Sequence, residues 1–251
     1  MKGLDMTKED DAQQGWDFMA NREWEQAEMA FRQVLAVDPF YPDALTGMAA
    51  LYLRLDEIEQ ARELCEMATS QAERALPRTK RHTGWEDESV RPYLRALYYL
   101  ALTYIRQEAW ALAQPALEEI VAWDVGGMEG EALDLLAQVL HRIGRVEEAV
   151  HAYVQAAEYL PEDYYTAGLL LWRRGKRREA ERFWRRALEH CPGLATLIVH
   201  FPRVLPNPRG VLHDPDFGRM VEYLEYQGEL WDDASKAELA SLWQKRVVHH
   251  G

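Results

Sequence analysis

Histidines, cysteines and a cluster of basic side chains are the residues of this chain that could carry chemistry. Eight histidines are scattered along the 251 residues. His200, His213 and Asp214 lie in one proline-rich stretch and could meet as metal ligands, as could the adjacent His249 and His250. The sequence contains no HExxH motif, no paired cysteines at metal-binding spacing and no glycine-rich phosphate loop. We therefore expect no catalytic residue, no bound metal and no cofactor.

The two cysteines, Cys65 and Cys191, are too few for a disulfide framework and are typical of small buried or loop residues. The first residues, MKGLDMTKEDDAQQ, are acidic and lack the apolar core of a secretory signal. No stretch approaches the about 18 uncharged apolar residues of a membrane span. These features predict a cytoplasmic protein without membrane insertion.

Basic side chains gather between Trp172 and Glu189. Eight basic and three acidic residues give this segment a net charge of +5, which leaves −18 on the rest of a chain whose total is −13. The basic residues are Arg173, Arg174, Lys176, Arg177, Arg178, Arg182, Arg185 and Arg186. They could contact an acidic protein or phosphate, or form a solvated face paired with acidic neighbours such as Glu179 and Glu181. The overall negative charge disfavours general binding to nucleic acid.

The elements that must position these side chains recur along the chain. An alanine marks each unit, and successive alanines lie 34, 52, 36 and 31 residues apart: Ala27, Ala61, Ala113, Ala149 and Ala180. Nine residues before each alanine stands a bulky apolar residue, and seven residues after it stands another apolar one. A period near 34 residues, with one insertion of 18, predicts a stacked array, because one repeat cannot bury its apolar face alone.

The first unit, from Gly15 to Pro39, resembles the tetratricopeptide repeat (TPR) signature. Gly15, Phe18, Ala27, Phe31, Val34 and Pro39 carry the resemblance, and Gly144, Ala149, Tyr153 and Pro161, then Gly175, Ala180, Trp184 and Pro192, repeat it. The resemblance implies an all-α fold, a right-handed superhelical solenoid of antiparallel helix pairs. It places five repeats at about 8–40, 42–76, 92–125, 129–161 and 162–192, within an array covering 7–192.

Three segments depart from the repeat pattern. An inserted loop at about 77–91 contains Trp85, and a proline-rich strap at 193–217 is expected to be irregular. Two helices, at about 216–228 and 234–247, would form a C-terminal helical cap spanning 218–251. Because an array needs an element over its last apolar face, we expect the cap to cover the fifth repeat. The strap could instead fold back into the groove of the array.

In the TPR family the first helix of each pair lines a concave groove that takes extended or helical peptides. The resemblance implies these groove residues: Trp16, Met19, Leu53, Arg54, Tyr98, Leu102, Ile105, Arg106, Gln138, His141, Arg142, Tyr165, Trp172 and Arg173. Most are apolar or aromatic, which suits an apolar or amphipathic peptide. The arginines recur once per repeat from the second repeat on and could grip carboxylates, or could simply be favoured at a helix C-terminus.

The function implied by the resemblance is a non-catalytic scaffold or adaptor that binds a peptide segment of another protein. Trp16, Trp85, Trp172 and Trp231 are the tryptophans expected at partner contacts. One alternative is a structural subunit that uses its convex face and cap in a larger assembly. Another is a regulator that contacts nucleic acid through the basic segment 172–189. The identity of the partner and the oligomeric state do not follow from the sequence.

Overall fold

All regular structure in the described part of the chain is helical, which confirms the predicted all-α class. The structure, a computed structural model, describes residues 8–76, 84–123, 127–202 and 216–250, with side chains up to residue 245. Residues 1–143 form one compact unit and residues 144–251 form another. Among the described helices, none combines the length and the apolar character needed to cross a membrane.

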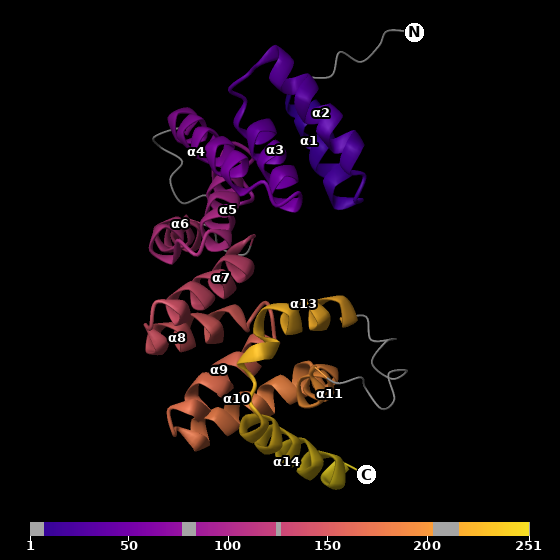
Figure 1. Ribbon diagram of the computed structural model, residues 1–251, viewed down its shortest axis with the longest axis vertical. Helices are drawn as coiled ribbons and strands as arrows, with labels where there is room; N and C mark the ends of the chain where they lie inside the picture. The colour runs from indigo at the N-terminus through magenta and orange to yellow at the C-terminus, as the bar shows by residue number, and fades with distance from the viewer. Residues whose placement is uncertain (1–7, 77–83, 124–126, 203–215, 251) are drawn as a thin grey trace. The chain divides into compact units, whose positions relative to one another are not determined.

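The first unit consists of consecutive helices that each pack on the next one along the chain (Figure 1). Their bounds are α1 Lys8–Ala20, α2 Trp24–Val37, α3 Pro42–Arg54, α4 Ile58–Ala75, α5 Arg91–Arg106, α6 Trp110–Trp123 and α7 Glu129–Arg142. Turns of three residues join α1 to α2, α3 to α4 and α5 to α6. Helices that pack after such short turns must run antiparallel.

The second unit contains three repeat helices that pack consecutively, followed by a terminal group. Its helices are α8 Val146–Ala156, α9 Asp163–Arg173, α10 Arg177–His190, α11 Pro192–His200, α13 Phe217–Gln227, the 3₁₀ turn η1 Gly228–Leu230 and α14 Asp233–His250. The predicted irregular strap is wrong at its start, since α11 is helical from Pro192. Proline is well suited to the first turn of a helix, where its missing N–H has no partner to lose. The rest of the strap, 203–215, and residues 77–83 of the inserted loop lie outside the described residues.

The turn inside each helix pair uses one left-handed residue, always five positions before the marker alanine. Arg22, Asp56 and Glu108 have φ angles of 62°, 63° and 56°, and Gly144 and Gly175 have φ angles of 83° and 77°. Only glycine adopts this conformation without a steric cost from Cβ. The same backbone turn therefore recurs along the chain whether or not the sequence supplies a glycine.

Phe31 fills the space between three helices of the first unit. Its side chain is fully buried, and a Cβ atom built on Gly15 of α1 would lie 2.4 Å from its Cε1 atom. A Cβ atom on Gly47 of α3 would lie 2.3 Å from its Cζ atom. Trp184 has the same relation to Gly168 in the second unit, at 2.4 Å from Cδ1. Glycine at these positions therefore lets the aromatic ring contact the neighbouring helix backbone directly.

We expect Gly47→Ala to lower the free energy of unfolding by about 1–3 kcal/mol, because the added methyl group overpacks a full core. Urea denaturation followed by circular dichroism measures the change. Gly218→Ala is the matched control: a Cβ atom there meets no atom within 4 Å, so this helical glycine should tolerate alanine. Equal stability of the two variants would contradict the packing role of Gly47.

Candidate functional site

Helix α3 lies almost wholly inside the first unit. Every residue from Asp43 to Leu51 is buried, including Thr46 and Ala50, which precede the predicted groove residue Arg54 by about two helical turns and one turn. Leu53, which we predicted as a groove residue, is also buried and packs with Ala49, Ala61 and Cys65. The prediction for Leu53 is corrected accordingly: at the second repeat the inner side of the array is filled by the protein's own side chains.

The side chains that cover α3 come from the helices on either side of it. Trp16 of α1 lies 5.4 Å from the ring of Phe31 and 5.7 Å from the ring of Tyr99 on α5. Tyr98 packs edge-on against Tyr99 at 5.6 Å. Since Trp16 and Tyr99 meet across α3, helices α1 and α5 close the surface above it. Trp16 is half-buried and belongs to this internal contact.

A buried ion pair fixes the start of α5. Arg95 donates a hydrogen bond of 2.6 Å to Asp43, and the two side chains are 11% and 12% exposed. The Arg95 guanidinium lies 4.3 Å from the ring centre of Trp16 and 5.3 Å from that of Trp85. Arg91 donates a hydrogen bond of 2.7 Å to the carbonyl of Trp85. Trp85, expected at a partner contact, is thus held against two arginines of its own chain.

The corresponding positions on α5 and α7 keep part of their surface open. Tyr98, Leu102 and Ile105 on α5 are half-buried, as are Gln138 and His141 on α7. Gln138 donates a hydrogen bond of 2.9 Å to Asp134, one turn earlier. Besides Trp16, which packs on Phe31 and Tyr99, these five side chains and the half-buried Met19 of α1 are the predicted non-arginine groove residues of the first unit that remain partly exposed. They present two aliphatic side chains, a thioether, a phenol, an amide and an imidazole.

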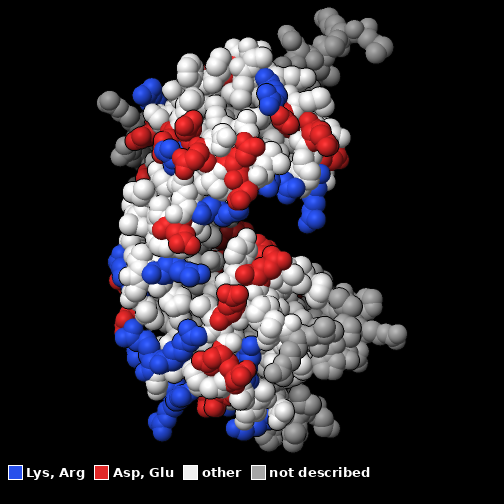
Figure 2. All heavy atoms as spheres, viewed as in Figure 1, with Lys and Arg blue, Asp and Glu red and all other residues white. Residues whose placement is uncertain are grey.

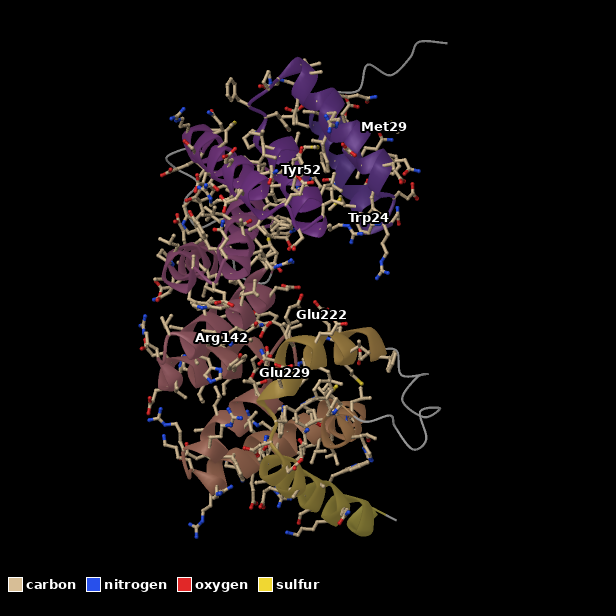
Figure 3. All side chains as sticks on the ribbon, in the orientation of Figure 1. Trp24, Met29, Tyr52, Arg142, Glu222 and Glu229 are labelled. Carbon is tan, nitrogen blue, oxygen red and sulfur yellow. The ribbon has the colours of Figure 1, made fainter. Side chains whose placement is uncertain are left out.

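The recurring arginines of the first unit contact the preceding repeat. The Arg54 guanidinium lies 3.5 Å from the ring centre of Trp24, and that of Arg142 lies 5.5 Å from the ring centre of Trp110. Arg106 donates a hydrogen bond of 2.5 Å to Asp56. Trp24 and Trp110 are the first residues of α2 and α6, while Arg142 ends α7 (Figure 3). An arginine at this place therefore holds the end of one helix against the start of an earlier one.

The inner side of α9 in the second unit is covered by the C-terminal helices. Every residue from Asp163 to Leu171 is buried. The hydroxyl groups of Thr166 and Tyr223 are 2.9 Å apart, and Gln227 donates a hydrogen bond of 3.1 Å to the hydroxyl of Tyr153. Arg173, predicted to face a ligand, donates to the carbonyl of Leu230. The terminal group therefore occupies the surface on which the fifth repeat would otherwise meet a peptide.

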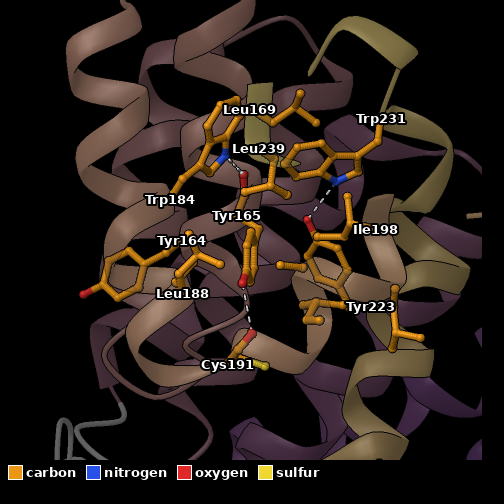
Figure 4. Packing of buried hydrophobic residues seen from close by; sticks show 14 of the residues in the cluster. Tyr164, Tyr165, Leu169, Trp184, Leu188, Cys191, Ile198, Tyr223, Trp231 and Leu239 are labelled. Carbon is orange, nitrogen blue, oxygen red and sulfur yellow. Dashed lines mark hydrogen bonds between the residues drawn. The ribbon is translucent and has the colours of Figure 1, made fainter. Parts of the chain in front are cut away.

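Two aromatic residues predicted to contact a partner lie in this core instead (Figure 4). Tyr165 is fully buried and its hydroxyl donates a hydrogen bond of 2.9 Å to the carbonyl of Cys191. Trp231 is 4% exposed, packs 5.7 Å from Trp184 and donates a hydrogen bond of 3.1 Å to the hydroxyl of Tyr223. Both predictions are wrong for the same reason: the terminal helices bury these rings.

The basic segment lies on the outside of the second unit, where Lys and Arg side chains gather over α8 and α10 (Figure 2). Arg174 pairs with Glu147 of α8 at 2.8 Å, and Arg185 lies 3.6 Å from Glu181. Arg177 lies over the ring of Trp172 at 3.9 Å. Trp172 is half-buried against the terminal core, and its indole N–H is buried without a partner among the described residues.

Neither cysteine is suited to nucleophilic chemistry. Both are free and buried. Burial raises the pKa of the Cys65 thiol to about 12 and that of the Cys191 thiol to about 11, because a thiolate would lose its hydration. Within the described residues, no three His, Cys, Asp or Glu side chains group as metal ligands. His213 and Asp214 lie outside those residues, and the side chains of His249 and His250 are not described.

Comparison with known proteins identifies the repeat. Two tetratricopeptide repeat models match the chain, over residues 18–79 and 98–163. No curated protein matches it in sequence.

Several solved structures share the fold. The structure titled "Functional Characterization of Pseudomonas Aeruginosa pilF" is similar over 97% of this chain and 93% of its own, with a TM-score of 0.60 and 16% identity. MamA is similar over 70% of this chain and 92% of its own (TM-score 0.53, 21% identity). YrrB, titled "a TPR protein with an unusual peptide-binding site", is similar over 72% of this chain and 85% of its own (TM-score 0.53, 18% identity). These similarities confirm the predicted TPR-like helical solenoid.

Proposed function

Because this chain belongs to the tetratricopeptide repeat family, we propose that it is a non-catalytic scaffold that binds a segment of another protein. The binding surface is the half-buried row of Tyr98, Leu102 and Ile105 on α5 with Gln138 and His141 on α7. The bound segment is apolar or amphipathic, and extended or helical. The proposed compartment is the cytoplasm, which agrees with two free, buried cysteines.

The observation that carries the proposal is a difference between equivalent positions. The second repeat buries Thr46, Ala50 and Leu53, and the fifth repeat buries Tyr165 and Leu169 but leaves Trp172 half-buried. The third repeat leaves Tyr98, Leu102 and Ile105 half-buried at the same three places in the repeat. A side chain that already contacts its neighbours but keeps one face open can be buried further by a ligand, and loses little conformational freedom when that happens.

The composition of the surface supports a protein ligand. An aromatic ring and aliphatic side chains supply apolar contact area, as anchor residues do in protein interfaces. Arg106 and Arg142 lie at the ends of the same helices, with 51% of the Arg106 side chain exposed. They can orient a carboxylate of the ligand while remaining near Asp56 and Trp110.

The test compares two double variants in the cell of origin. Ile105→Glu/His141→Glu introduces charge into the proposed surface, and Leu55→Glu/Leu112→Glu is the control, because Leu55 and Leu112 are exposed elsewhere in the same unit. We expect the first variant to lose at least about tenfold of the protein co-purified with the wild type, because burying an unpaired carboxylate opposes binding. The control should retain it. Quantitative mass spectrometry measures recovery, and thermal denaturation checks that both variants are folded.

A photoreactive benzoylphenylalanine placed at Tyr98 then identifies the ligand directly. Cross-links from position 98 to the protein that the Ile105→Glu/His141→Glu variant loses would place its segment on α5. Equal recovery by both double variants would contradict the proposal. The binding surface would then be sought among the exposed apolar residues of α2 and the following turn, Met29, Val37 and Phe40. That result would favour the alternative function of a structural subunit.

A further inference from the structure

Helix α10 carries a face made of arginines on the side opposite its buried residues. Arg178, Arg182, Arg185 and Arg186, here called the arginine face, are all exposed. At 100° per residue they fall within an arc of about 100° around the helix axis. The buried residues Ala180, Trp184 and Ala187 lie on the other side. Glu189 is the acidic side chain at the C-terminal end of the same arc.

The arginine face is poorly neutralised by the protein itself. In the described part of the chain, neither Arg178 nor Arg182 has a carboxylate within ion-pair distance, and Arg185 has only Glu181 at 3.6 Å. Arg174, just before the helix, is paired with Glu147 and is therefore not counted among the unpaired arginines. Like charges one turn apart repel each other, so this arrangement costs stability unless an anion offsets it.

Arg186, at one edge of the arginine face, contacts an aromatic residue of the same unit. The Arg186 guanidinium lies 5.7 Å from the ring centre of Tyr164, whose ring stacks on Phe183 at 5.9 Å with an interplanar angle of 15°. An arginine placed over a ring keeps the N–H groups along its edge available for two parallel hydrogen bonds. The Arg186 side chain is therefore already restrained in the free protein, so binding a ligand costs less side-chain conformational entropy.

We propose that the arginine face is a second interaction surface, separate from α5 and α7, and that it binds a carboxylate-rich segment of a partner protein. Guanidinium groups bind carboxylates through paired, charge-assisted hydrogen bonds. Arg178, Arg182 and Arg185 repeat at four and three positions, which matches carboxylates spaced one helical turn apart on a helical ligand. The net charge of −18 on the rest of the chain repels a long polyanion or an anionic membrane, whereas a short segment contacts only α10.

The experiment measures binding of a fluorescent 12-residue oligoglutamate peptide to the full chain by anisotropy, at 50 mM and 300 mM salt. The test variant is Arg178→Glu/Arg182→Glu/Arg185→Glu. The control is Arg22→Glu/Arg32→Glu/Arg74→Glu, which changes the net charge equally at exposed residues of the first unit. A 20-base-pair DNA duplex and phosphatidylserine vesicles serve as competing anions. Circular dichroism confirms that both variants are folded.

We expect the test variant to bind the peptide about 30-fold more weakly than the wild type, and the control to stay within about threefold of it. Equal weakening in both variants would overturn the proposal, because it would show attraction to net charge rather than to α10. Failure of the wild type to bind the peptide would also overturn it. Tighter binding of the duplex or the vesicles than of the peptide would overturn the proposal, because it would indicate nucleic acid or lipid as the ligand of the arginine face.

Discussion

Arg95→Ala is expected to lower the free energy of unfolding by about 3–5 kcal/mol, as measured by urea denaturation. The substitution leaves the Asp43 carboxylate, which is 12% exposed, without its cation in a dry part of the first unit. It also removes the group that lies between Trp16 and Trp85. The loss therefore combines an uncompensated charge with lost packing, and exceeds what an exposed ion pair contributes.

Two controls separate these causes. Arg95→Met/Asp43→Leu removes both charges and keeps most of the volume, so it should be much more stable than Arg95→Ala. Arg62→Ala breaks exposed pairs with Glu59 and Glu66 and should cost below about 1 kcal/mol. If Arg95→Ala were as mild as Arg62→Ala, the Asp43–Arg95 pair would have no special role in holding α5 against α3.

Trp231→Ala is expected to destabilise the second unit by about 3–5 kcal/mol. The ring is nearly fully buried, lies 6.5 Å from the ring of Tyr165 and 5.7 Å from that of Trp184, and hydrogen-bonds Tyr223. Hydrogen exchange followed by mass spectrometry should show lost protection in α9 and α14 while α1–α5 keep theirs. This pattern follows because the ring belongs to the core of one unit.

The control for Trp231 is Tyr226→Ala in the same terminal group. Tyr226 is 64% exposed, so its removal should change stability by less than about 0.5 kcal/mol. Loss of protection spread evenly over the whole chain in Trp231→Ala would contradict a local role. Retained protection in α9 would show that the terminal helices cover it without stabilising it.

The fold class and the family were predictable because they depend on residue types at fixed spacing. Phe31 opposite Gly15 in the first repeat, and Trp184 opposite Gly168 in the fifth, are size relations between neighbouring helices that stand at the same places in the repeat. The helical start of α11 was missed because several prolines predicted irregular structure. Pro192 occupies the first turn, where proline is favourable, and the following Leu194, Ala195, Leu197 and Ile198 are buried.

The open and closed parts of the inner surface could not be predicted from the repeat. Thr46, Tyr98 and Tyr165 occupy the same place in the second, third and fifth repeats, and their different burial depends on contacts between distant segments. Thr46 is buried within the first unit, where Trp16 contacts Tyr99, whereas Tyr165 is buried beneath the terminal helices. Pairings of this kind follow from the packed structure and leave no local pattern in the sequence.

The burial of α9 by the terminal helices has a consequence for synthesis of the chain. Thr166 and Tyr223, which share a hydrogen bond, are 57 residues apart. At about 5–20 residues per second, a ribosome needs about 3–11 s to make the residues between them. During that interval the first unit has already been made, while Leu169 and Tyr165 still lack their cover. We therefore expect a nascent chain that has reached α10 to expose apolar surface for chaperones, and a chain stalled there to be prone to aggregation.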